Sequence, residues 1–115
     1  MKKLLTILCL VLLVSCSNEV PSDKLVERQG IKYKINSTTP FTGSSLSYNK
    51  NGQLLWRQNY KNGILHGPYE YFHENGQLKV RGNNKNGKTD GLWESFHENG
   101  QLEQRLTFKD GVLQD

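Results

Sequence analysis

Two histidines and two glutamates recur at one interval, and their side chains are of the types that transfer protons or bind metal. His73 and His97 lie 24 residues apart, and so do Glu70 and Glu94. The histidine spacing matches no known set of metal ligands, so we expect structural histidines beside turns. A carboxylate pair that hydrolyses glycosides spans about 5 to 10 Å across a cleft, and residues two strands apart in a flat sheet lie near the upper limit. We therefore expect solvated glutamates paired with nearby basic groups.

Other catalytic signatures are missing from the sequence. It contains no G-x-S-x-G, no H-E-x-x-H and no phosphate-binding loop pattern. The sequence accordingly predicts no enzyme, no cofactor and no metal site.

Three arginines keep the same interval and form the strongest candidate for a binding site. On strands, alternation would point them away from Leu54, Leu78 and Leu102, onto the face that carries three periodic glutamines. This candidate binding face consists of Arg57, Arg81, Arg105, Gln53, Gln77 and Gln101. One interpretation is a docking strip for an acidic protein surface, an anionic lipid headgroup or a polysaccharide, because guanidinium groups bind carboxylate and phosphate bidentately. The other is pairing of the arginines with Glu70 and Glu94 on neighbouring strands.

The elements that position these residues belong to a repeated unit with regularly spaced turns. The block Asn-Gly-Gln-Leu starts at positions 51, 75 and 99, and Lys-Asn-Gly or Lys-Asp-Gly starts at 61, 85 and 109. Asn-Gly and Asp-Gly favour the positive φ angles of primed hairpin turns. The predicted turn residues are Asn51, Gly52, Asn62, Gly63, Asn75, Gly76, Asn86, Gly87, Asn99, Gly100, Asp110 and Gly111. Between the turns, hydrophobic residues alternate with a period of two, which indicates strands.

The predicted fold is all-β: an antiparallel meander of β-hairpin repeats with a 24-residue period, in a single twisted open sheet. Gly82-Asn83-Asn84 replaces the more apolar strand ending Gln58-Asn59-Tyr60, so we expect a weaker middle hairpin. The last strand is expected to be an exposed edge, which could associate with a second copy of the chain.

Charge and length exclude several classes of protein. The 115 residues carry a formal net charge of +4, and loss of Lys2 and Lys3 with a leader would reduce it to +2. Proteins that bind nucleic acid concentrate Lys and Arg to displace counterions, so no nucleic-acid partner is expected. The length allows one small domain.

The N-terminus has the pattern of an export signal. Lys2 and Lys3 precede an apolar stretch at residues 4–14, which is too short for a transmembrane helix of roughly 20 residues. The stretch ends in Leu-Val-Ser-Cys, which resembles the bacterial lipobox and implies lipidation of Cys16. The alternative is an ordinary cleaved signal with an incidental cysteine. Ser17 favours the outer membrane if the source is Gram-negative, and the polar residues that follow predict an extended tether.

The repeat pattern resembles the MORN repeat variant of bacterial proteins grouped as the YwqK-type antitoxin family. The resemblance rests on an opening glycine, aromatic residues, Phe-His-Glu-Asn-Gly-Gln-Leu and a closing Lys-Asn-Gly, over about residues 40 to 113. It implies a degenerate copy at 31–43 and repeats at about 43–66, 67–90 and 91–115. The predicted domains are a signal peptide at 1–15, a lipidated cysteine and tether at 16–30, and a repeat domain at 31–115.

The resemblance and the lipobox together imply a function in binding. They predict a non-catalytic, membrane-anchored lipoprotein that acts as a protein-binding β-repeat module on the cell envelope. Two alternatives stay open: an antitoxin or immunity-like protein that neutralises one toxin, and a structural protein that binds peptidoglycan or another anionic polymer. The expected partners are the membrane, through lipid on Cys16, and one unidentified protein.

Overall fold

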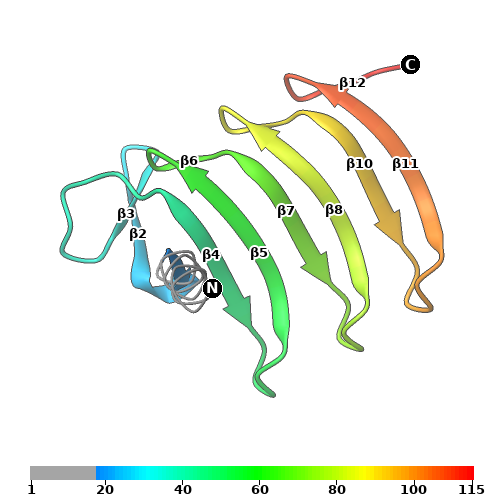
Figure 1. The fold of residues 1–115 in the computed structure, drawn as a ribbon, viewed down its shortest axis with the longest axis horizontal. Coiled ribbons are helices and arrows are strands. Elements are labelled where there is room, and N and C mark those ends of the chain that lie inside the picture. The colour runs from blue at the N-terminus through cyan, green and yellow to red at the C-terminus, as the bar shows by residue number, and fades with distance from the viewer. Residues whose placement is uncertain (1–17) are drawn as a thin grey trace, which may run out of the picture.

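The computed structural model describes residues 18–115 and confirms an all-β fold built on one large open sheet. The strand order is β1-β4-β5-β7-β8-β10-β11-β12, with β6 paired to β5 and β9 paired to β8 (Figure 1). The predicted signal peptide at 1–15 and Cys16 lie outside the described residues. Within residues 18–115, no helix has the length and apolar character needed to cross a membrane.

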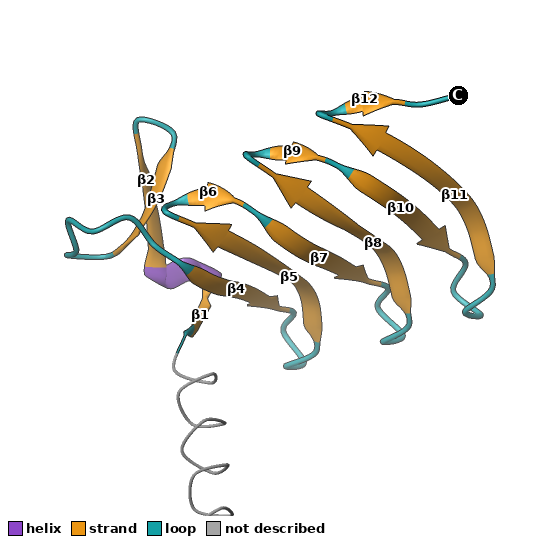
Figure 2. Ribbon diagram, turned by 45° about the horizontal axis from the view of Figure 1, so that its top comes forward, coloured by secondary structure: helices purple, strands orange, loops and turns teal. Residues whose placement is uncertain are grey.

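Each repeat contributes one long hairpin and one short strand (Figure 2). The long hairpins pair β4 (Gly43–Tyr48) with β5 (Leu54–Lys61), β7 (Gly67–Phe72) with β8 (Leu78–Lys85), and β10 (Gly91–Phe96) with β11 (Leu102–Lys109). The short strands are β6 (Ile64–Leu65), β9 (Lys88–Thr89) and β12 (Val112–Leu113). Neighbouring repeats join where β5 pairs with β7 and β8 pairs with β10. The predicted 24-residue period is therefore the period of the structure.

Each long hairpin contains a β-bulge at the same place. In the first hairpin, Ser47 pairs with Trp56 and the next residue, Tyr48, pairs with Leu54, so Leu55 has no residue opposite. The equivalent extra residues in the other hairpins are Lys79 and Glu103. A bulge shifts side-chain alternation by one residue and strengthens the local twist.

The turns are of two kinds, although one kind was predicted. Asn62, Asn86 and Asp110 have φ angles of 52°, 52° and 50°, and each precedes a glycine with positive φ. These are primed turns, as predicted. In the loops at 51–52, 75–76 and 99–100 only the glycine has positive φ. Those loops leave five residues between their strands, against two in the primed turns, and their glycine follows a tight turn before the next strand begins.

Backbone hydrogen bonds connect each primed turn to the segment just before the first strand of the same long hairpin. The amide of Gly63 donates to the carbonyl of Phe41 at 2.7 Å. The same bond recurs one repeat later from Gly87 to Leu65 at 2.9 Å and again from Gly111 to Thr89 at 2.8 Å. The turns at 86–87 and 110–111 are thereby fixed to the short strands β6 and β9 of the preceding repeat.

The predicted tether at 16–30 is wrong for its described part, because the chain is already structured there. β1 (Glu19–Pro21) pairs in parallel with β4, and a 3-10 turn at Ser22–Lys24 follows. β2 (Leu25–Arg28) and β3 (Ile31–Lys34) then form a separate hairpin. Its turn, Gln29-Gly30, has φ angles of 52° and 82°, the primed geometry without the usual Asn or Asp.

The hydrophobic core is thin, as expected for a single-layer sheet. Among the described residues, the buried large apolar side chains are Phe41, Leu46, Tyr60 and Tyr69. Phe41 packs on Tyr60 with ring centroids 6.0 Å apart. Much of the stability must therefore come from strand pairing and from polar contacts between repeats.

Candidate functional site

One face of the sheet carries a row of alternating charges, which we call the charged face. Its members are directly opposite one another on β5, β7, β8, β10 and β11: Arg57, Glu70, Arg81, Glu94 and Arg105. Directly opposite residues of a sheet point to the same side. The repeat therefore brings the three predicted arginines and the two predicted glutamates onto one surface.

Glu94 is the centre of this row. Its side chain is only 2% exposed and lies between two arginines. The Nε of Arg81 donates to Oε1 at 2.7 Å, while the Nε and Nη2 of Arg105 donate to Oε2 at 2.9 and 2.7 Å. The hydrogen bonds from Arg105 and then from Arg81 hold the pKa of Glu94 below its ordinary value, although its burial acts in the opposite direction. Glu94 is consequently an ionised carboxylate at neutral pH.

Arg57 is in a different environment. Its Nη2 lies 3.5 Å from Oε2 of Glu19 on β1, and its buried Nε has no hydrogen-bond partner. Glu70 faces Arg57 and Arg81 in register, but forms no ion pair among the described residues. Pairing of the arginines with glutamates was one of the two predicted interpretations, and the structure shows it for Arg81 and Arg105 with Glu94.

The predicted orientation of the arginines relative to the leucines is wrong. Arg57 pairs with Leu46 and Leu54 pairs with Tyr48, and these two partners are alternate residues of one regular strand. The leucine and the arginine therefore share a face, because the bulge at Leu55 shifts the alternation.

The predicted glutamines do not join the arginines in the strands. Gln53, Gln77 and Gln101 lie in the three longer loops, where their carbonyls accept hydrogen bonds from Asn49, His73 and His97 at 2.9, 2.8 and 2.9 Å. Their backbone amides donate to asparagine side chains in the same loops. Their backbone groups thus close the turns.

The histidines also have structural contacts. Nε2 of His73 donates to the carbonyl of Phe96 in the next repeat at 2.8 Å, and Nδ1 of His97 lies 4.0 Å from Oε2 of Glu103. In residues 18–115 no group of three or more His, Cys, Asp or Glu side chains is placed to hold a metal ion. Glu70 and Glu94 line a common hollow of about 520 Å³ on the charged face, and Arg81 lies between them in the charged row.

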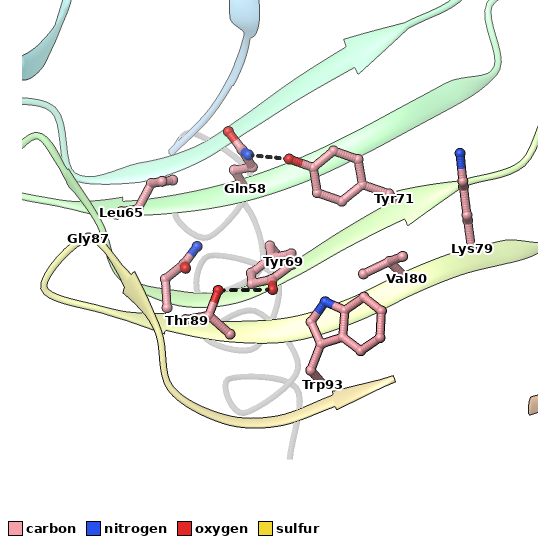
Figure 3. Close-up of a pocket in the computed structure, with 10 residues that line it drawn as sticks. Gln58, Leu65, Tyr69, Tyr71, Lys79, Val80, Gly87, Thr89 and Trp93 are labelled. Atoms are coloured by element: carbon pink, nitrogen blue, oxygen red, sulfur yellow. Dashed lines mark hydrogen bonds between the residues drawn. The ribbon is translucent and has the colours of Figure 1, made fainter. Parts of the chain in front are cut away.

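The opposite side of the sheet, the aromatic face, carries Trp56, Tyr69, Tyr71 and Trp93. Tyr71 packs against Trp56 and Tyr69 with ring centroids 6.5 and 6.0 Å apart. The phenol of Tyr71 accepts a hydrogen bond from the Gln58 amide at 2.8 Å, and the phenol of Tyr69 lies 3.4 Å from the Thr89 hydroxyl. Figure 3 shows the two hydrogen bonds, which orient the rings of Tyr71 and Tyr69.

A hollow of about 560 Å³ opens on the aromatic face beside these rings. Trp93 lies beside Val80 and Tyr69 at one side of it, and Lys79 stands at its edge (Figure 3). We call it the central hollow, because the middle repeat supplies most of its lining. The volume falls in the range of roughly 300–1,000 Å³ that is usual for small-molecule sites. Of the residues that line this hollow, Gly87 was predicted as a turn residue, and none was predicted as part of the candidate binding face.

Comparison with known proteins agrees with the repeat structure. The MORN repeat variant family matches residues 41–63, 65–88 and 89–110, which together make up more than half of the chain. Each matched segment contains one long hairpin. No curated protein and no solved structure shows significant similarity to the chain. The match is to the repeat, and the narrower antitoxin grouping stays a prediction.

Proposed function

The chain belongs to the MORN repeat variant family, and on that premise we propose that it is a non-catalytic, membrane-anchored lipoprotein that binds another protein at the cell envelope. The observation that carries this proposal is the rigid placement of two arginines on an open sheet. Arg81 and Arg105 have side chains that are 55% and 60% exposed, although both are fixed by the buried Glu94.

Such arginines suit the recognition of an acidic protein surface. Arginine is enriched among the residues that dominate binding energy at interfaces. A side chain already held in one conformation loses less entropy when a partner binds. Each guanidinium group also has more N–H donors than its contacts with Glu94 use. The charged face therefore offers preorganised donors to carboxylates of a partner.

The membrane anchor is the second part of the proposal. It rests on the lipobox sequence that ends at Cys16, and Ser17 favours the outer membrane. Several acyl chains on one cysteine give stable anchoring, because each buried methylene contributes about 0.8 kcal/mol. Labelled palmitate should enter the wild-type protein and not the Cys16→Ser variant. Equal labelling of the two would refute lipidation at Cys16.

The binding proposal is tested by affinity capture of the tagged full-length protein from detergent-solubilised membranes, followed by mass spectrometry. The test variant combines Arg81→Gln, Glu94→Gln and Arg105→Gln, which removes the exposed cations without leaving a buried carboxylate unpaired. Glu94→Gln alone is the comparison variant: it keeps both arginines but removes the carboxylate that positions them, so its capture should be weaker than that of the wild type and stronger than that of the triple variant. One stoichiometric protein whose capture decreases in this order supports the proposal.

Other outcomes identify the alternatives. A captured toxin whose activity is blocked would identify an antitoxin or immunity protein. Retention on peptidoglycan with release by salt, without a stoichiometric protein, would identify a structural envelope protein. Equal capture by all three proteins would exclude the charged face as the binding surface.

A further inference from the structure

The central hollow arises where the middle repeat departs from its neighbours. At the position of Asn84, the first and third repeats carry aromatic residues, Tyr60 and Phe108. Each of the three residues pairs directly with the glycine that opens the first strand of its repeat. An amide in place of a ring leaves space on the aromatic face and lines that space with a polar group.

The environment of Asn84, in addition to the hollow itself, indicates a ligand. Asn84 is only 6% exposed, and it lines the hollow. The backbone carbonyl accepts from Asn83, but among the described residues the side-chain amide has no hydrogen-bond partner. The amide atoms are open to the hollow, because Nε of Arg57 is the fully buried side-chain polar atom without a partner in residues 18–115. Water or a ligand in the hollow can therefore supply the hydrogen bonds of the Asn84 amide.

The neighbouring groups define the chemistry of that ligand. Trp93, Tyr69 and Tyr71 present aromatic rings, while Asn84 and Thr89 present an amide and a hydroxyl. Lys79 is the one charged residue of the lining, which contains no carboxylate. The hollow therefore combines flat apolar surfaces with uncharged hydrogen-bonding groups. We propose that it binds one pyranose ring of a neutral saccharide.

A pyranose ring matches both kinds of surface. The face of the ring that carries C–H groups can pack on an aromatic side chain, through apolar contact and weak C–H interactions. Its hydroxyl groups donate and accept hydrogen bonds, as the Asn84 amide requires.

Two other ligand classes fit less well. An acyl chain would displace the water that can hydrogen-bond to Asn84 and Thr89, and it has no polar group to take the place of that water. An anion such as phosphate would find a single lysine and no arginine in the lining.

The test is titration of the ¹⁵N-labelled protein by NMR with four probes: maltotriose, chitotriose, octanoate and inorganic phosphate. The signals to follow are the indole N–H of Trp93 and the side-chain amide of Asn84. We expect saturable shifts of both signals with at least one of the two saccharides and with neither octanoate nor phosphate. Shifts with octanoate or phosphate alone, or no saturable shift with any probe, would overturn the proposal.

Variants at equivalent positions separate binding from folding. Asn84→Tyr fills the hollow with the residue that the first repeat carries at position 60, so it should keep the fold and weaken saccharide binding at least about tenfold. Phe108→Tyr makes a matched change in the third repeat and should leave affinity unchanged. Should Asn84→Tyr lose its dispersed spectrum, Trp93→Leu is the second variant, and it should weaken binding by a similar factor. Wild-type affinity in a folded Asn84→Tyr or Trp93→Leu protein would refute the site.

Discussion

Glu94 fixes two repeats to each other with a single side chain. It sits on β10, and its two arginines come from β8 of the preceding repeat and from β11 of its own. A buried carboxylate is tolerated because charged hydrogen bonds replace its lost hydration. Removal of the carboxylate leaves Arg81 and Arg105 without the acceptor that positions them. This residue should therefore influence both the stability of the sheet and the shape of the charged face.

The pKa of Glu94 determines how its contribution depends on pH. The hydrogen bonds from Arg105 and Arg81 lower that pKa in the folded protein below 4.5, so the unfolded chain takes up the proton first as the pH falls. The stabilisation is thus complete above pH 4.5 and is lost as the pH falls through the folded-state pKa. We expect Glu94→Gln to lower the melting temperature at pH 7, and the difference from wild type to shrink in acid. Thermal unfolding followed by circular dichroism between pH 3 and 7 measures both.

Glu70→Gln is the matched control, because Glu70 occupies the same position one repeat earlier without an ion pair among the described residues. Its effect at pH 7 should be the smaller of the two. A difference between wild type and Glu94→Gln that stays constant down to pH 3 would contradict the assigned role.

The sequence predicts that arginines and glutamates meet, but not which of them do. Glu70 and Glu94 are equivalent by period, and only the folded geometry distinguishes the carboxylate that lies between two guanidinium groups. Asn84 shows a similar limit. Its departure from the repeat is visible in the sequence and indicates a weaker hairpin, whereas the hollow becomes apparent only when Trp93 and Tyr69 are placed around it.

At the scale of elements, glycines in the two kinds of turn should differ in their tolerance of substitution. Gly52 and Gly63 both have positive φ, at 81° and 80°. A Cβ at Gly52 would meet nothing within 4 Å, whereas one at Gly63 would overlap Cγ2 of Ile31 and lie 2.9 Å from the Lys32 carbonyl oxygen. We expect Gly52→Ala to cost about 1–2 kcal/mol through backbone strain. Gly63→Ala should cost about 1–3 kcal/mol more through overlap.

Urea denaturation of the two variants beside wild type provides the measurement. The matched φ angles cancel the strain, so the difference between the variants reports the packing of the first primed turn against β3. Equal losses of unfolding free energy would show that this packing contributes nothing.

Turn positions and strand alternation could be predicted from the sequence because each depends on local residue preferences. The bulges could not, because an extra residue such as Leu55 is defined by the register with the opposite strand. The strands at 19–28 were missed for a related reason. Their pairing with β4 and β3 depends on contacts distant in sequence, and Gln29-Gly30 lacks the usual hairpin signal.

At the scale of the whole molecule, the two edges of the sheet differ. β1 covers part of β4 at one edge. At the other edge, the side of β11 that faces away from β10 pairs only at its end, with β12. β5 and β8 each pair with a following repeat, and the equivalent segment of β11 at Gln104 and Arg105 has no such strand among the described residues. Exposed strand edges invite pairing with another chain.

We therefore expect reversible dimers through β11, visible as a mass that rises with concentration in analytical ultracentrifugation. Gln104→Lys should shift the equilibrium to monomer, because two-fold pairing around this residue brings two lysines together. Gln58→Lys is unsuitable as a control, since the side chain of Gln58 donates a hydrogen bond to the phenol of Tyr71. Lys61→Gln, away from β11, is preferable. A wild-type protein that stays monomeric at every concentration would exclude the association.

The early start of the sheet determines where the proposed anchor holds the domain. Only Ser17 lies between Cys16 and Asn18, whose carbonyl already accepts a hydrogen bond from Ser44 at 2.9 Å. Two residues span at most about 7 Å. If Cys16 carries lipid, the end of the sheet that holds Gly43 must lie close to the headgroups, and the longer loops must lie about 20 Å farther away along the strands.

Fluorescence quenching in lipid vesicles tests this orientation. Lys61→Cys places a dye at the Gly43 end, since Gly43 pairs with Tyr60, and Glu74→Cys places it in a loop at the opposite end. A headgroup quencher should reduce emission strongly at position 61 and weakly at position 74, because contact quenching falls off over a few ångströms. In protein that also carries Cys16→Ser, the headgroup quencher should not reduce the emission of the dye at either position. Equal quenching at the two positions would mean that the domain moves freely over the surface, and stronger quenching at position 74 would mean that the sheet lies the other way up.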